Sequence, residues 1–238
     1  MNQLSDHVWV FNGKPVTFMT LPFTTRMTIV KLSDTTLWVH SPIKLTAELK
    51  AQVNAIGKVQ YLIAPNHLHH LFLKEWQATY PEAKTYGTQE VIKKRADLSF
   101  TASLTSDKTY PWSEEIDSLL FTGSPLMQES VFFHRASKSL ILTDLIENFP
   151  PSDFTRIQRM FAKVTGILAP NGQTPIDWRM SFLFHKKEAR KHYLQMASWQ
   201  PQRIILAHGE IIHRDAVAFL ERSFRWLNLS SKHISKSK

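Results

Sequence analysis

Three histidines, His67, His69 and His70, lie within four consecutive positions directly after the apolar segment Val59–Ala64. Neutral imidazole is the commonest protein ligand for zinc, copper, iron and nickel. On a strand, His67 and His69 would share one face while His70 pointed away, so the rings can converge only if the chain turns here. We therefore expect a strand followed by a turn. A metal site is one interpretation of the cluster, and a chance group of surface or capping histidines is the other.

Two distant polar residues also follow apolar segments. Asp144 comes directly after Ser139–Thr143, and His208 comes directly after Arg203–Ala207. Each alone has an ordinary explanation, Asp144 as a turn cap and His208 as a buried histidine bonded to a carbonyl. Three strands that each deliver a ligand-type side chain at their end favour a metal site on an α/β scaffold, because strands hold side chains more tightly than loops do.

The composition narrows the kind of site. The chain has no cysteine, which excludes disulfides, thiolate ligands and a cysteine nucleophile, so any metal must be held by His, Asp or Glu. Its 43% apolar residues, with 7 Trp and 15 Phe, suffice for a substantial core. The N-terminus lacks a signal-peptide pattern and no apolar run reaches about 18 residues. We expect a cytoplasmic protein with no membrane partner.

The formal net charge is +9, concentrated partly in 185–192 and in the tail 230–238. A basic surface is typical of proteins that bind polyanions, and a nuclease-like protein would use such a surface to bind nucleic acid. No RNA- or DNA-binding motif accompanies the charge, however, and a solvated helix face plus a disordered tail explains it. We expect a small-molecule substrate rather than nucleic acid, and the oligomeric state is left open. Residues 1–228 are predicted to form one domain, and 229–238 a basic, disordered tail.

The pattern of apolar residues predicts strands first and then an alternation of strands and helices. The predicted strands are Val8–Phe11 and Pro15–Leu21 as a pair, Met27–Leu32 and Thr36–His40 as a hairpin, then Val59–Ala64, Lys84–Tyr86, Leu119–Thr122, Ser130–His134, Leu140–Thr143 and Arg203–Ala207. The predicted helices are Leu45–Ile56, Leu71–Tyr80, Gln89–Ala96, Phe154–Lys163, Lys186–Ser198 and Arg214–Leu227.

With these elements in place, the chain resembles the metallo-β-lactamase superfamily over nearly its whole length. That superfamily has a His-x-His-x-Asp-His motif after a strand, a later His, an Asp that ends a strand and a final His. Pro65-Asn66-His67-Leu68-His69-His70 aligns with the motif, and Thr143-Asp144 and Ala207-His208-Gly209 match the later elements. The resemblance implies an α/β fold (α+β in some schemes), specifically a four-layer αβ/βα sandwich.

The chain also departs from the superfamily's motifs. Pro65 stands in place of the first histidine, His69 in place of the aspartate, and 124–126 contains no middle histidine. The resemblance therefore implies that the first of the superfamily's two metal sites is lost. The second would consist of His69, His70, Asp144 and His208. This set of three imidazoles and one carboxylate suits one divalent ion, zinc first and iron as an alternative.

Two functions follow from this interpretation. The first is a metal-dependent hydrolase-like protein that acts on an unknown ester, thioester, amide or phosphoester, with His67 and Asp144 as the catalytic residues. His67 would be a nearby ligand or proton carrier. The alternative is a binding or scaffold protein with the same fold and no activity, because loss of one metal site removes the pair of ions that many relatives use.

Overall fold

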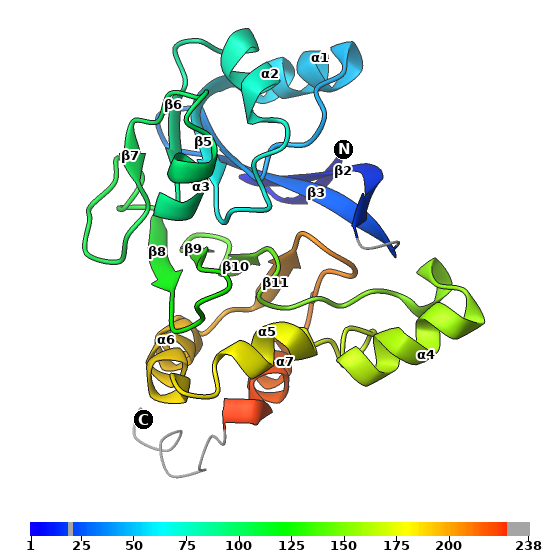
Figure 1. Cartoon of the computed structure of the whole chain (residues 1–238). Coiled ribbons are helices and arrows are strands. Elements are labelled where there is room, and N and C mark those ends of the chain that lie inside the picture. The colour runs from blue at the N-terminus through cyan, green and yellow to red at the C-terminus, as the bar shows by residue number, and fades with distance from the viewer. Residues whose placement is uncertain (19–20, 228–238) are drawn as a thin grey trace.

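Two β-sheets packed face to face carry the fold, and helices cover both outer faces (Figure 1). The computed structural model describes residues 1–18 and 21–227. In the first sheet the strands follow chain order, β1 to β7, and in the second the order is β11-β10-β9-β8. The predicted tail, 229–238, lies outside the described residues, as does part of the predicted strand Pro15–Leu21.

The first sheet consists of β1 (Asn2–Ser5), β2 (Val8–Phe18), β3 (Leu21–Lys31), β4 (Thr36–His40), β5 (Lys58–Ala64), β6 (Lys84–Gly87) and β7 (Ala102–Ser103). The second consists of β8 (Ile116–Phe121), β9 (Glu129–His134), β10 (Ser139–Leu142) and β11 (Arg203–Leu206). The helices are α1 (Ala47–Ile56), α2 (Leu73–Thr79), α3 (Gln89–Lys94), α4 (Arg156–Thr165), α5 (Ile176–Ser181), α6 (Lys186–Ser198) and α7 (Ala216–Ser223), with short 3-10 turns at Pro151–Asp153 and Arg225–Leu227.

The apolar residues divide into layers because the central strands are buried on both faces. Trp38 of β4 and Phe132 of β9 meet between the two sheets, with ring centroids 4.9 Å apart. The neighbouring Val39 instead packs outward in the cluster that contains Val53 of α1. On the far side, helices α6 and α7 cover the outer face of the second sheet. This arrangement is the predicted four-layer sandwich.

Local signals explain several element boundaries. Helix α1 begins after Thr46, whose side chain accepts a hydrogen bond from the Leu49 backbone, and it ends at Gly57. Strand β4 and helix α6 have the bounds that the apolar pattern predicts. In the described residues no helix is long and apolar enough to cross a membrane.

The prediction of two paired strands at Val8–Phe11 and Pro15–Leu21 is wrong. Val8–Phe18 is one strand that pairs along its length with β3, and the register shifts between Gly13 and Val16. A bulge of this kind lets a strand accommodate Gly13 and Pro15, which otherwise signal a break.

Candidate metal centre

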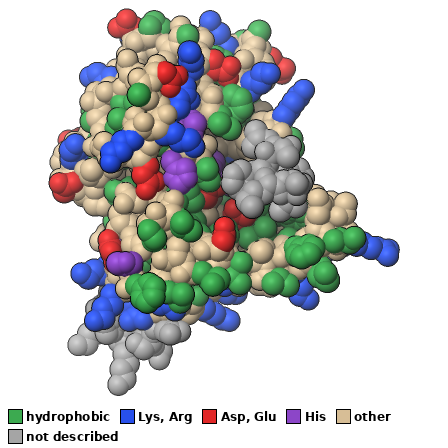
Figure 2. All heavy atoms as spheres, viewed as in Figure 1, with side chains coloured by type: hydrophobic (Ala, Val, Ile, Leu, Met, Phe, Trp, Pro, Cys, Tyr) green, Lys and Arg blue, Asp and Glu red, His purple; other side chains and the backbone are tan. Residues whose placement is uncertain are grey.

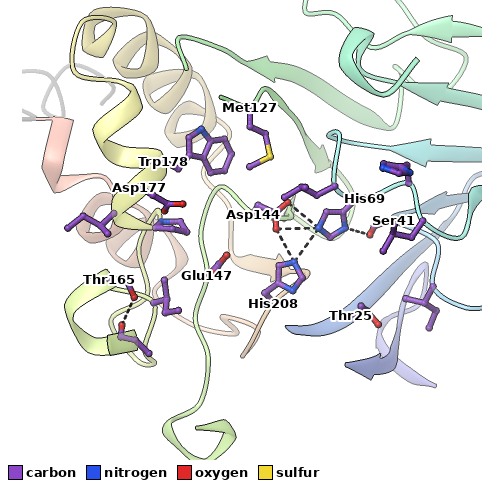
Figure 3. A pocket seen from close by; sticks show the side chains of 18 of the residues that line it. Thr25, Ser41, His69, Met127, Asp144, Glu147, Thr165, Asp177, Trp178 and His208 are labelled. Carbon is purple, nitrogen blue, oxygen red and sulfur yellow. Dashed lines mark hydrogen bonds and ion pairs between the residues drawn. The ribbon is translucent and has the colours of Figure 1, made fainter. Parts of the chain in front are cut away.

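Side chains from three strand ends converge where the two sheets meet (Figure 3). His69 lies in the turn after β5, Asp144 follows β10 and His208 follows β11. Because β10 and β11 are parallel neighbours, their carboxyl ends lie side by side, which brings Asp144 next to His208. One ligand atom from each of the three residues lies within 4.8 Å of the other two.

The distances show how tightly the group is assembled. His208 Nε2 lies 2.9 Å from Asp144 Oδ1, and His69 Nε2 lies 3.2 Å from Asp144 Oδ2. The two Nε2 atoms are 3.2 Å apart. Two imidazole nitrogens and one carboxylate oxygen therefore point at one place, and all three side chains are largely buried.

Both histidines of the group form a hydrogen bond through the ring nitrogen that faces away from Asp144. His208 Nδ1 lies 2.6 Å from the Thr24 carbonyl oxygen, to which it donates a hydrogen bond, so its Nε2 lone pair faces the group. His69 Nδ1 is hydrogen-bonded to the Ser41 hydroxyl. Partners of this kind fix the orientation of histidines that bind metals in proteins.

Asp144 is positioned by two residues that the sequence analysis did not select. Asn66 Nδ2 donates to Asp144 Oδ2 at 2.7 Å. The carboxylate of Glu129, fully buried at the start of β9, accepts the backbone N–H groups of Thr143, Asp144 and Leu145 at 2.8, 2.8 and 3.0 Å. Asn66 also lies 3.2 Å from Glu129, so the histidine turn and the Asp144 loop share one anchor. The available signal was an acidic residue beginning an otherwise apolar strand.

The charges in the group complement one another. Burial opposes ionisation of Asp144, but the charges of His69 and His208 and their hydrogen bonds hold the pKa of the carboxyl well below its usual range. Burial would lower the pKa of His208, yet its hydrogen bond to Asp144 and the charges of Asp144 and Glu147 raise it. Asp144 is therefore a carboxylate anion between the two imidazoles, although it is buried.

The donor set fits one divalent cation. Two histidine nitrogens and a carboxylate oxygen are ligands that zinc, iron and nickel accept, and magnesium and calcium prefer oxygen alone. Three protein donors also leave one position of a tetrahedral ion for water or substrate, which is the pattern of catalytic rather than structural zinc sites.

The structure does not bring His70 and His67 into this group. His70 Nδ1 lies 3.2 Å from an Arg95 guanidinium nitrogen, and burial lowers its pKa to about 4, with the charges of Lys94 and Arg95 adding to the effect. His67 Nδ1 pairs with Glu90 of α3 at 3.0 Å. The turn after β5 thus sends only His69 toward Asp144. The ligand role of His70 and the catalytic role of His67 stay predictions.

A cavity of about 670 Å³ opens onto the three residues. Its wall is mostly apolar and includes Leu68, Met127, Phe161 and Trp178. Glu147 also lines it, and burial raises the pKa of that carboxyl to about 8, although the charge of His208 lowers it in part. The cavity has the size of a small-molecule site and holds a carboxylic acid that is still protonated at neutral pH.

A family model described as "Domain of unknown function (DUF4336)" matches residues 5–165, well over half of the sequence. The chain belongs to the DUF4336 family. No curated protein matches the sequence of this DUF4336 protein.

Solved structures similar to the DUF4336 protein include several metallo-β-lactamases. DIM-1, in a crystal exposed to ceftazidime, is 13% identical with a TM-score of 0.64, and the match covers 95% of each chain. The enzyme from Hirschia baltica is 13% identical with a TM-score of 0.61, covering 94% of this chain and 95% of that one. The enzyme from Erythrobacter litoralis is 10% identical with a TM-score of 0.64, covering 95% of each.

These likenesses confirm the predicted fold, which is that of the metallo-β-lactamase superfamily. At such low identities the fold of the DUF4336 protein is all that they establish. It stays a prediction that the segment 65–70 is a degenerate form of the histidine motif of that superfamily.

Proposed function

We propose that the protein is a metal-dependent hydrolase-like protein in which His69, Asp144 and His208 hold one divalent ion, zinc first and iron as an alternative. The observation that carries the proposal is the convergence of these three donors within 4.8 Å at the wall of a cavity. The hydrogen bonds behind His69 and His208 add to it, because they aim the nitrogens before any ion arrives.

When bound, the ion would supply a Lewis acid and a water of lowered pKa, which suits hydrolysis of an ester, thioester, amide or phosphoester. The chain's own residues supply positioning and a proton. Asp144 stays ionised and holds the two imidazoles, and Glu147 holds a proton in the cavity wall that it can give to a departing oxygen or nitrogen.

The cavity wall favours substrates with an apolar group. The lining is mostly apolar and includes Leu68, Met127, Phe161 and Trp178. Transfer of an apolar part of the substrate from water to this wall stabilises binding by about 25 cal/mol per Å². A polar sugar or a highly charged nucleotide would have to place many of its polar atoms against this apolar wall. We therefore propose substrates with an apolar acyl or aryl part next to the bond that is cleaved.

Metal content of the protein purified without a chelator or a His tag, measured by plasma mass spectrometry, tests the proposal. We expect about one equivalent of zinc or iron, lost in His208→Ala and in Asp144→Ala. His70→Ala separates a three-donor from a four-donor site, since it retains the metal only if three donors suffice. His67→Ala is the matched control. Wild-type protein that neither contains nor takes up a metal would refute the proposal.

Ser41 gives a second candidate function that needs no metal. It follows β4 with φ of 53°, a left-handed conformation that costs a non-glycine residue about 1–2 kcal/mol, and it lines the cavity. Its hydroxyl is bonded to His69, whose other nitrogen faces Asp144. This is the order of nucleophile, base and carboxylate in serine hydrolases, although the two ring nitrogens are exchanged.

In that mechanism the Ser41 oxygen bonds to the acyl carbon, His69 Nδ1 takes the hydroxyl proton, and the proton passes to the leaving group as its bond to the acyl carbon breaks. Water then adds to the acyl carbon, the bond to Ser41 breaks, and the proton that His69 takes from the water returns to the Ser41 oxygen as the acid is released. Hydrolysis of an apolar aryl ester in the presence of a chelator distinguishes the two candidates. Activity that survives the chelator and is lost in Ser41→Ala supports the serine mechanism. Activity that needs metal and survives in Ser41→Ala when zinc is supplied in excess supports the metal site. A metal-loaded protein inactive on all ester classes would leave the binding or scaffold alternative.

A further inference from the structure

Helix α4 presents its apolar side to solvent. Ile157, Met160, Phe161 and Val164 are spaced for one helix face, and 60–69% of each residue is exposed. Ala162 is the helix residue that is buried, against a small cluster around Phe149 and Phe154. A surface helix normally turns such a face toward the core, so this one is arranged for contact with something else.

The exposed apolar surface continues beyond α4. Figure 2 shows hydrophobic side chains gathered in a band along the lower edge of the molecule, where Figure 1 places α5 and α4. Exposed members of this stretch are Ile176, Met180, Leu183 and Phe184, the last of them 94% exposed. Soluble monomers seldom display a contiguous patch of this kind unless it binds a partner or a membrane.

The charges that border the patch identify the partner. The segment 153–188 contains six cations and three acids: Arg156, Arg159, Lys163, Arg179, Lys186 and Lys187 against Asp153, Asp177 and Glu188. Apolar side chains flanked by Lys and Arg are the pattern of helices that lie in the interface of an anionic bilayer. A second copy of the chain would bring the same cations together across a twofold axis, which opposes pairing.

The patch adjoins the cavity. Phe161 and Ile176 are both exposed and both line the cavity that holds His69, Asp144 and His208. An apolar compound dissolved in a bilayer would therefore meet the opening without crossing water. This last step rests on the proposed function, whereas the docking surface does not.

We propose that α4, α5 and the turn at 182–184 form a docking surface for an anionic lipid bilayer. The sequence predicted no membrane partner on two grounds, the lack of a spanning segment and of a signal-peptide pattern. In-plane binding needs neither, since exposed apolar area and basic flanks suffice.

Flotation of the full chain with vesicles tests the surface. Vesicles of phosphatidylcholine alone are compared with vesicles that contain about 30% phosphatidylglycerol. We expect binding to the anionic vesicles, weakened by added salt. Ile157→Gln/Met160→Gln/Val164→Gln, at positions outside the cavity wall, should weaken binding at least about tenfold. Arg156→Gln/Lys163→Gln should weaken it about 30-fold, because each cation contributes about fivefold.

Lys50→Gln/Lys58→Gln is the matched control, because it removes the same charge at exposed positions on and after α1. It should bind as the wild type does. Equal loss in this control would assign binding to net charge and overturn the proposal, as would no binding to either vesicle. A dimer that Ile157→Gln/Met160→Gln/Val164→Gln disrupts, without vesicle binding, would assign the surface to a second copy. None of these variants alters a metal donor, so the outcome is independent of metal content.

Discussion

Glu147 is a buried acid whose effect on stability should depend on pH in a specific direction. Only 6% of the residue is exposed, and burial raises the pKa of its carboxyl from 4.5 to about 8. Between these two values the folded protein keeps a proton that the unfolded chain releases. Because the native state binds more protons in this window, the free energy of unfolding falls as the pH rises through it.

The size of the effect follows from the pKa difference. One pKa unit corresponds to about 1.4 kcal/mol, so between pH 4.5 and pH 7 the buried acid costs the folded state about 3 kcal/mol. Glu147→Gln keeps the shape of the neutral acid and cannot ionise. We therefore expect the variant to match the wild type at pH 4.5 and to exceed its free energy of unfolding by about 3 kcal/mol at pH 7.

Urea denaturation at pH 4.5, 6 and 7 measures this difference. A chelator must be present, because a cation held by His208 would favour the ionised form of Glu147. Glu48→Gln, at an exposed position on α1, controls for the loss of one formal charge. A difference that does not grow with pH, or a variant less stable than the wild type at pH 7, would refute the reasoning. If Glu147 also supplies a proton in catalysis, the more stable variant will be the less active one.

Three other substitutions test how the site is held. Glu129→Gln should lower the free energy of unfolding by about 2–4 kcal/mol in urea titrations, because an amide group would face three backbone N–H donors with one oxygen; an unchanged midpoint would contradict the anchor. Ser41→Ala should weaken zinc binding about 10–100-fold by competition titration if the hydroxyl orients His69, and unchanged affinity would contradict that role. Gly209→Ala should lower the melting temperature, because a Cβ there would lie 2.1 Å from the Asn148 carbonyl oxygen at φ of +90°; unaltered melting would show that the loop adapts.

Sequence patterns were sufficient where one physical requirement dominates. Buried strands need apolar runs, and a polar residue directly after such a run lies at the edge of the sheet, where a site can form. Asp144 and His208 could therefore be selected together although 64 positions separate them, and the parallel pairing of β10 and β11 brings them together. Periodicity predicted the order of strands and helices, whereas the four-layer arrangement was implied by the resemblance of the motifs at 65–70, 143–144 and 207–209 to those of the metallo-β-lactamase superfamily.

Sequence patterns were insufficient where side chains of one type compete for one position. His67, His69 and His70 are chemically identical, and only the path of the turn decides which ring faces Asp144. Glu129 was missed for a different reason, since its partners are backbone N–H groups, which every residue possesses. The acidic residue at the start of an apolar strand was a signal that Glu129 is unusual, but it did not indicate which loop the carboxylate holds.

Helix α4 shows why periodicity cannot say what an apolar face will contact. The predicted helix Phe154–Lys163 is confirmed as α4, and the spacing of its apolar residues would serve equally well in a helix packed on the core. The positive charge had first suggested polyanions such as nucleic acid. In the structure the cations of 153–188 border a patch of exposed aliphatic and aromatic side chains. A phosphate backbone would leave that apolar area in water, whereas a bilayer with anionic headgroups satisfies the charges and buries the apolar side chains together, which is why the lipid surface is the partner that accounts for both.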